Sequence, residues 1–311
     1  MNWFIVRSTF CAVIVFGTLQ QGFPSFGATL VGSDLFRDTF DRPDNNDIDA
    51  VTTGITNNTG TTFGASAVYS TPWVDPNNQS GGPDASAANG GGQRIAANDF
   101  QLKYNPGTAN AFVNHNFTNA DILAAGGFAV SLDVVAYNQA TIGQGAAIAI
   151  GMSQAEALMG RDANDGSPAL GAPGFKYTNA FQSTATTATV LSDFFLALRG
   201  TSTLAWGIGG AAAPAPTSVA VASKTGTISA DFRFADFNAG STVNYIVYYN
   251  GVSQGSGTFT WSGTNENYIG LDGRDNTVVR VDNFAITVPE PATVLLAFLA
   301  LAASGWRRQL D

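Results

Sequence analysis

The sequence predicts an all-β fold, a two-sheet antiparallel jelly-roll sandwich, on three observations. Helix formers are scarce, since only three of the 23 acidic residues are Glu and Lys and Arg together number 14. A dozen or more short segments carry strand patterns. Many of the 35 Gly residues, with Asn, stand between these segments, where turns need them. A solitary β-helix stays open as the alternative fold.

Strand signals recur along the whole body of the chain. Residues 100–104 alternate cleanly, and Phe232, Phe234 and Phe237 lie largely on one face of their segment. Asn250-Gly251 suits the positive φ angles of a type I′ turn, which predicts a hairpin there. In chain order the predicted strands are 35–40, 100–104, 128–137, 146–152, 193–199, 229–237, 243–249, 256–261, 268–271 and 278–287. The only predicted helix is 153–159, and the stretches 77–92 and 209–216 are predicted surface loops.

The N-terminal residues have the layout of a secretory signal peptide. Arg7 is the only early charge, an apolar run follows at 10–19, and then comes a polar stretch. Ser25 and Gly27 place small residues at the −3 and −1 positions of a cleavage between Gly27 and Ala28. The apolar run is too short for a membrane span. The sequence therefore predicts a signal peptide at 1–27, whose removal takes away Cys11, the only cysteine.

The C-terminal residues form a second transport signal. Pro289-Glu290-Pro291 precedes an almost wholly apolar stretch, with a predicted hydrophobic helix at 292–306, and Arg307 and Arg308 follow it. Such a helix is short for a bilayer, and the Arg pair holds the extreme terminus on the cytoplasmic side. The alternative is a plain C-terminal membrane anchor. The predicted organisation is thus a signal peptide at 1–27, a sandwich domain at 28–288 and a sorting segment at 289–311.

This C-terminal pattern resembles the PEP-CTERM sorting signal. The resemblance rests on Pro289, Glu290 and Pro291 as the recognition element and on Arg307 and Arg308 as the stop signal. It implies a partner, a membrane protease of the exosortase type, in Gram-negative bacteria that make extracellular polysaccharide. It also implies a chain that is held in the membrane before processing and then reaches the cell surface or the extracellular matrix. The sorting signal gives no information on what the domain at 28–288 binds or catalyses.

The body is similar to the concanavalin A-like jelly rolls, the lectin, glucanase and laminin-G superfamily. The likeness is carried by residues 36–42 near the start, by the 248–251 hairpin and by residues 281–286 at the end. In such jelly rolls a structural calcium often ties the first strand to the last. Transferred by position, the resemblance implies a calcium ion between Asp38 and Asp282.

Aspartate chemistry is compatible with that calcium site. Asp-rich clusters lie at 38–47, 162–166 and 272–282, and carboxylate oxygens are ligands that Ca²⁺ prefers. The alternative is that these residues belong to solvated turns, where Asp caps backbone amides. Structural zinc, iron–sulfur clusters and disulfide frameworks are excluded by a single His and a single Cys. A net charge of −9 repels nucleic acid.

No catalytic residue is predicted. Laminarinase-type relatives of this superfamily carry acidic residues spaced by two along one strand, and that signature is absent. His115 is predicted to be a hydrogen-bonded strand residue, and the G-x-S-x-G match around Ser253 lacks a following helix. Exposed aromatic rings would suit a sugar platform, although large rings also dominate sandwich cores. The candidates for such a platform are Trp73, Trp206, Trp261, Tyr104 and Tyr268.

These observations predict an exported, non-enzymatic protein of the cell surface or extracellular matrix, with a structural or glycan-binding role. Two alternatives stay open. One is a secreted polysaccharide hydrolase or lyase, and the other is an adhesin that binds protein partners.

Overall fold

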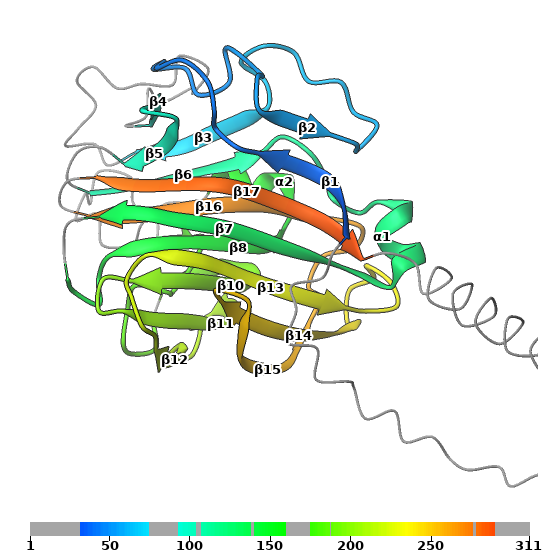
Figure 1. Cartoon of the computed structure of the whole chain (residues 1–311). Helices are drawn as coiled ribbons and strands as arrows, with labels where there is room; N and C mark the ends of the chain where they lie inside the picture. The colour runs from blue at the N-terminus through cyan, green and yellow to red at the C-terminus, as the bar shows by residue number, and fades with distance from the viewer. Residues whose placement is uncertain are drawn as a thin grey trace, which may run out of the picture.

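Two β-sheets packed face to face make up the body, as predicted. The computed structural model describes residues 32–74, 93–103, 107–137, 140–159, 175–186, 188–275 and 278–289. The strands of each sheet run across the molecule in two layers (Figure 1). All strand pairs are antiparallel except that of β9 with β10. The two-sheet antiparallel sandwich is therefore confirmed.

The first sheet contains both ends of the described chain. Its order is β15-β14-β13-β7-β17-β1-β2, with β5 paired to β17 and to β4. Its strands are β1 (Gly32–Asp38), β2 (Ile55–Asn57), β4 (Arg94–Ala96), β5 (Asp99–Lys103), β7 (Gly127–Tyr137), β13 (Gly226–Arg233), β14 (Thr242–Tyr249), β15 (Val252–Thr260) and β17 (Val279–Pro289).

The second sheet has the order β12-β11-β10-β8-β16-β6-β3, with β9 beside β10. Its strands are β3 (Tyr69–Val74), β6 (Gly107–Val113), β8 (Gly145–Met152), β9 (Phe175–Lys176), β10 (Thr189–Arg199), β11 (Thr203–Ala211), β12 (Thr217–Ala220) and β16 (Tyr268–Asp275). Successive strands β6, β7, β8 and β16, β17 alternate between the two sheets, which is how a jelly roll differs from a simple meander.

The aromatic residues that the sequence spaces along one face meet between the sheets. Phe232 from β13 packs on Phe128 from β7, with ring centroids 5.1 Å apart, and on Phe194 from β10 at 5.4 Å. Phe234 and Phe237 are buried in the same cluster, although they follow the end of β13 at Arg233, four residues before the predicted strand end at 237. The predicted hairpin also forms, because Asn250 and Gly251 take φ angles of 48° and 75° between β14 and β15. The core thus follows the period-2 pattern of the strands.

Three parts of the fold depart from the sequence prediction. A second helix, α1 (Ala120–Ala125), precedes β7, in addition to α2 (Gln154–Met159) at the predicted position. The predicted loop at 209–216 is partly strand, because β11 continues to Ala211. The prediction did not contain the short strands β2, β4, β9 and β12, nor the longer strands β3, β6 and β11. The predicted loop at 77–92 lies outside the described residues.

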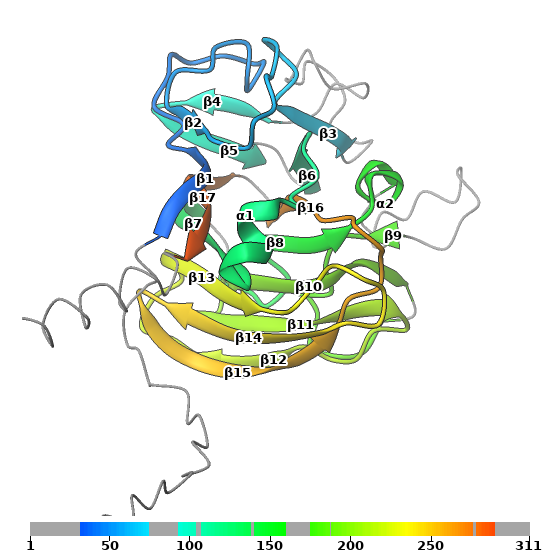
Figure 2. The same cartoon turned by 90° about the vertical axis from the view of Figure 1, so that its right-hand side faces the viewer.

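Helix α1 lies at the end of the sandwich where β1 begins and β17 ends (Figure 2). Asn119 caps its start by accepting a hydrogen bond from the Asp121 N–H, and Gly126 ends it with a φ of 70°. Ile122 is the buried residue that fixes it to the core. Within the described segments, no helix is both long and apolar enough to cross a membrane.

Candidate functional site

The predicted sorting motif starts inside the folded sheet. Pro289 is the last residue of β17, one residue beyond the predicted domain end, and it is buried and paired with Gly32 of β1. Pro289 therefore has no flexible spacer between itself and the body. The other residues of the predicted sorting and cleavage sites lie outside the described residues: Glu290, Pro291, Arg307, Arg308, Gly27 and Ala28, with the helix 292–306 and the signal peptide 1–27.

Asp38 forms a buried ion pair with Arg42. The guanidinium donates to Oδ1 at 2.7 Å and to Oδ2 at 2.9 Å, and the two side chains are 0% and 1% exposed. The Phe40 N–H also donates to Oδ1, at 2.8 Å, and the Tyr69 hydroxyl donates to Oδ2 at 3.0 Å. Burial raises the pKa of Tyr69 well above its usual value, so its hydroxyl stays a donor. Both oxygens of Asp38 therefore have partners within the protein.

Asp282 has a separate set of contacts on β17. The Asn283 N–H donates to its Oδ1 at 2.8 Å and the Asn283 amide donates to its Oδ2 at 3.1 Å. Burial raises the pKa of Asp282 to about 6, and the nearby negative charges of Asp99, Asp41 and Asp133 act in the same direction. Asp282 is thus a half-buried carboxylate that is easier to protonate than a free one.

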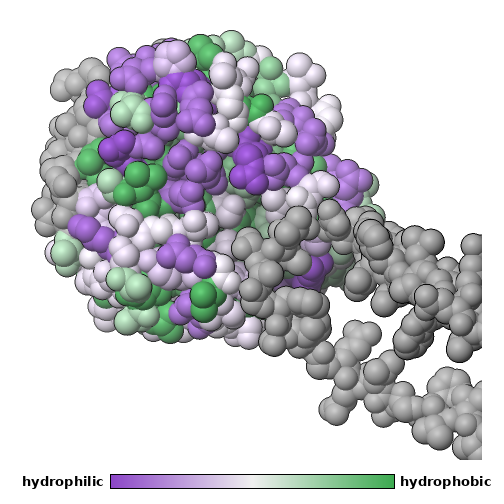
Figure 3. Space-filling model, in the orientation of Figure 1, coloured by the Kyte–Doolittle hydropathy of each residue, from purple (hydrophilic) through white to green (hydrophobic). Residues whose placement is uncertain are grey.

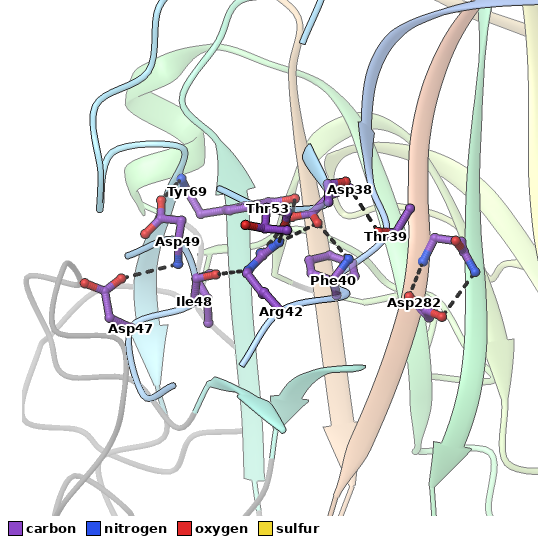
Figure 4. Close-up of polar contacts among 12 residues, drawn as sticks. Asp38, Thr39, Phe40, Arg42, Asp47, Ile48, Asp49, Thr53, Tyr69 and Asp282 are labelled. Atoms are coloured by element: carbon purple, nitrogen blue, oxygen red, sulfur yellow. Dashed lines mark hydrogen bonds and ion pairs between the residues drawn. The ribbon is translucent and has the colours of Figure 1, made fainter. Parts of the chain in front are cut away.

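The terminal strands are neighbours, as the calcium prediction requires, but their carboxylates turn to different partners. In the register of β1 with β17, Asp38 stands opposite Phe284. The Asp38 carboxylate points toward Arg42, whereas Asp282 lies apart with its own contacts (Figure 4). A cation bound to Asp38 would be repelled by the Arg42 guanidinium, so the arrangement of these side chains does not favour a calcium ion shared with Asp282. Calcium binding by this pair stays a prediction. Over the described part of the chain, no group of three or more His, Cys, Asp or Glu side chains is placed to hold a metal ion. The cluster at 162–166 lies outside it.

A row of mostly small or polar residues crosses the outer face of the first sheet. The strand registers align Tyr248 of β14, Ser229 of β13, Ser131 of β7, Ala285 of β17 and Arg37 of β1. We call these five residues the polar row. Because the residues between them on each strand face the core, the row lies on the outer side.

Carboxylates flank the polar row on both sides. The Tyr248 hydroxyl donates to Asp231 at 2.9 Å, and the Asn283 amide donates to Asp133 at 2.9 Å. Burial raises the pKa of Asp231, although the bond from Tyr248 opposes that rise. Hydrophilic residues gather on this side of the molecule over β1, β17 and β7 (Figure 3). Tyr248, Ser229 and Ala285 are 3%, 4% and 1% exposed, so the face presents polar groups to solvent mainly at Ser131, Asp133 and Arg37. Hydroxyl, carboxylate and guanidinium groups are the chemistry that hydrogen-bonds sugar hydroxyls.

The outer face of the second sheet is covered. All eight residues of β8 are buried, including Ala147 and Ala149, which point away from the inner core. Residues 175–186 pack over them, and Phe181 and Tyr177 contribute the largest side chains of that layer. Arg199 fixes the layer by donating to the carbonyls of Ala180 and Gln182. This layer therefore covers the second sheet over Ala147, Phe195 and Ala197.

Asp193 is one of the buried acids that the sequence did not single out. It lies on β10 where the pairing with β11 shifts register, and it is 7% exposed. The Ser262 N–H donates to its carboxylate at 2.9 Å, and Gly151 leaves the room that its side chain needs. Burial raises the pKa of Asp193 to about 6, with a further contribution from the charge of Glu156. A perturbed acid beside a second acid is a feature of general acid–base sites.

Asp193→Asn is expected to stabilise the protein at pH 7 and to leave its stability unchanged at pH 4. The folded protein binds the Asp193 proton more tightly than the unfolded chain, so the free energy of unfolding falls as pH rises from about 4 to about 6. The substitution removes that penalty, on the order of 1–3 kcal/mol, and keeps an acceptor for Ser262. Melting temperatures at both pH values measure it, with exposed Asp121→Asn as control. An equal change at pH 4 and pH 7 would contradict the buried charge.

The predicted aromatic platform divides into core and surface. Trp261 is fully buried and Trp206 is 4% exposed, so neither ring is open to a sugar. Tyr268 is partly exposed and packs edge-on against Phe112. The Trp73 side chain and all of Tyr104 lie outside what the structure describes. His115 is hydrogen-bonded as predicted, because its Nδ1 lies 3.0 Å from the Thr61 hydroxyl, but it follows the end of β6 at Val113 and is not a strand residue.

Two kinds of comparison place these features beside known proteins. Residues 287–309 match the family model of the PEP-CTERM protein-sorting motif. No curated protein matches the chain. Among solved structures, the chain is similar to an endo-1,3-beta-glucanase from Streptomyces sioyaensis, with 13% identity, 84% of this chain and 98% of that chain covered, and a TM-score of 0.44.

Lectin structures are similar to the chain over a smaller part of it. The exoplasmic/lumenal domain of VIP36, in a form bound to Ca²⁺ and Man3GlcNAc, has 6% identity, covers 63% of this chain and 81% of its own, and has a TM-score of 0.40. Lectin I-B4 from Griffonia simplicifolia has 8% identity, covers 63% and 90%, and has a TM-score of 0.38. The chain carries a PEP-CTERM sorting motif and is thus an exported protein, anchored in the membrane before processing and extracellular afterwards.

Proposed function

We propose that this protein is a non-enzymatic component of the cell surface or of an extracellular polysaccharide matrix, with a structural or glycan-binding role. The observation that carries the proposal is the PEP-CTERM motif at residues 287–309. A signal peptide cleaved between Gly27 and Ala28 delivers the chain, and an exosortase-type protease then processes it at Pro289-Glu290-Pro291. The sandwich domain then remains outside the cell and is the part of the protein that carries the structural or glycan-binding role.

The polar row supports a glycan-binding role. Ser131 and Arg37 are the members of the row that reach solvent, and their hydroxyl and guanidinium groups, with the carboxylate of Asp133 beside Ser131, can hydrogen-bond a polymer that lies along the sheet. Such a strip suits an extended chain of sugar hydroxyls better than a closed pocket would.

Ser131→Trp is expected to weaken polysaccharide binding at least tenfold, because the indole fills the middle of the polar row. Val135→Trp is the matched control, since Val135 lies on the same strand and face, beyond the row, and is already 38% exposed. Binding of the purified chain to the host's extracellular polysaccharide is measured by pull-down and on a glycan array. Equal binding by both variants and the parent would place the glycan contact elsewhere.

A second candidate function is a polysaccharide hydrolase, favoured by one observation. Asp193, with a pKa raised to about 6, has Glu156 close enough to influence it, and such a pair can divide the roles of acid and base. The same binding assay, analysed for released oligosaccharides, separates the two functions. Product that forms with the parent and is lost in Asp193→Asn would replace the binding role by hydrolysis.

A further inference from the structure

A pocket lies at the end of the sandwich from which the sorting signal continues. It has a volume of about 380 Å³, and Val288 and Pro289 of β17 form part of its wall. Ala124 of α1 and Asn58, after β2, contribute other parts of the wall. The first residue of the sorting motif is therefore also a wall residue of a pocket on the body.

The length of chain after Pro289 places this pocket close to the membrane before processing. The predicted hydrophobic helix starts at 292, only three residues further on, and an extended residue spans at most about 3.6 Å. The end of the sandwich then lies within roughly 11 Å of the point where the helix begins. A membrane protease that reads Pro289 must approach α1 and the start of β1, because Pro289 is paired with Gly32.

The charged residues at the rim of the pocket indicate which kind of partner could bind there. Asp34 is already paired with Arg37, whose Nε and Nη2 donate to it at 2.7 and 2.9 Å. Asp121 is exposed and, among the described residues, has no ion-pair partner, because only its backbone N–H is bonded, to Asn119. The rim thus keeps one unbalanced negative charge beside the apolar surface of Ala124 and Val288.

We propose that this pocket is the docking site of the sorting protease, which inserts a cationic side chain with apolar neighbours beside Pro289. The proposal rests on the proposed processing at the PEP-CTERM motif. Asp121 pairs with the cation, and the apolar wall receives the neighbouring side chains. The body of the protein then contributes to recognition, in addition to the motif itself.

Charge reversal and filling of the pocket test the docking site in the full chain. Asp121→Lys and Ala124→Trp are each expected to slow processing at least tenfold in a host with the matching protease, followed by pulse-chase of the full-length and processed forms. Both residues are exposed, and the capping bond of Asp121 uses its backbone. Asp41→Lys, the same charge change at an exposed position beyond the other end of β1, is expected to process like the parent. Unaltered melting temperatures show that the variants are folded.

Two further variants separate the docking site from the sorting motif and from unfolding of the strand end. Glu290→Ala is expected to stay full-length, and its normal processing would overturn the proposed sorting function itself. A disulfide between Ala129→Cys and Thr287→Cys, which stand opposite each other in β7 and β17 and do not line the pocket, is made in the Cys11→Ser background and is expected to leave processing unchanged. If Glu290→Ala is blocked while Asp121→Lys and Ala124→Trp behave like the parent, the docking site is wrong. If the disulfide also blocks processing, the protease acts on an unpaired strand end instead.

Discussion

Replacing Arg42 by Met is expected to lower the free energy of unfolding by about 3–5 kcal/mol, because it leaves the Asp38 carboxylate buried without its counter-charge. Arg42 supplies both guanidinium contacts to Asp38, and its Nε also donates to the Ile48 carbonyl at 2.9 Å. Only the Phe40 N–H and the Tyr69 hydroxyl would remain as donors to Asp38. Urea unfolding of the parent and the variant, with both m-values, measures the loss.

Arg37→Met is the matched control for Arg42→Met. It breaks an Arg–Asp pair of similar geometry with Asp34, but the Arg37 side chain is 36% exposed and that of Asp34 is 26% exposed. Water can solvate the remaining carboxylate there, so a cost of about 0–1 kcal/mol is expected. Equal losses of unfolding free energy in the two variants would show that burial does not increase the contribution of the Asp38–Arg42 pair to stability.

The same unfolding curves, recorded with millimolar calcium and with a chelator, test the cation that the sequence predicts between Asp38 and Asp282. With Arg42 present, the guanidinium occupies the place of a cation beside Asp38, so equal curves are expected for the parent. A calcium-dependent rise that disappears in Asp282→Ala would restore the predicted site.

The fold could be predicted because its long strands carry their own pattern. Residues 128–137 alternate from Val130 to Val134, which marks their buried face, and residues 243–249 are nearly all β-branched or aromatic and end at the Asn250-Gly251 turn. The shortest strands that escaped prediction have too few residues for a period to show, as in β9 with its two residues. The nine-residue β11 was missed for another reason, because three of its residues are Gly, which is depleted from strands. Helix α1 has six residues and only one buried side chain, so its start signal at Asn119 had no apolar stripe to support it.

The candidate site was harder to predict than the fold, because it depends on contacts between side chains. Asp38 and Arg42 are four residues apart, yet the turn alternative for Asp38 predicts only a capped amide, which Phe40 provides, and not burial. Asp193 receives its hydrogen bond from Ser262, 69 residues away, and local sequence carries no trace of that contact. The apolar run of β8 did contain a usable signal, because a strand without polar residues on either face has to be covered on both.

Trp261→Ala is expected to cost about 3–5 kcal/mol of unfolding free energy while the folded fraction binds polysaccharide like the parent. The sequence admits Trp261 as either a sugar platform or a core residue, and the structure places it in the core with no exposed surface. Its ring stacks on Phe234 at 5.8 Å and meets Phe237 at 5.2 Å and Phe259 at 6.1 Å. Alanine leaves a cavity among these rings, which cannot close without moving β15 and the segment after β13.

Tyr268→Ala is the comparison that separates packing from recognition. Tyr268 is partly exposed and has one aromatic contact, with Phe112 at 6.0 Å, so a smaller loss of stability is expected. For a domain of this size, each kcal/mol lowers the melting temperature by roughly 2–4 °C, which makes the two variants easy to distinguish in one thermal scan. Polysaccharide binding is then compared well below both melting temperatures. A loss of binding in folded Trp261→Ala that exceeds the loss in Ser131→Trp would mean that the glycan contact depends on the β14–β15 end of the sheet rather than on the polar row.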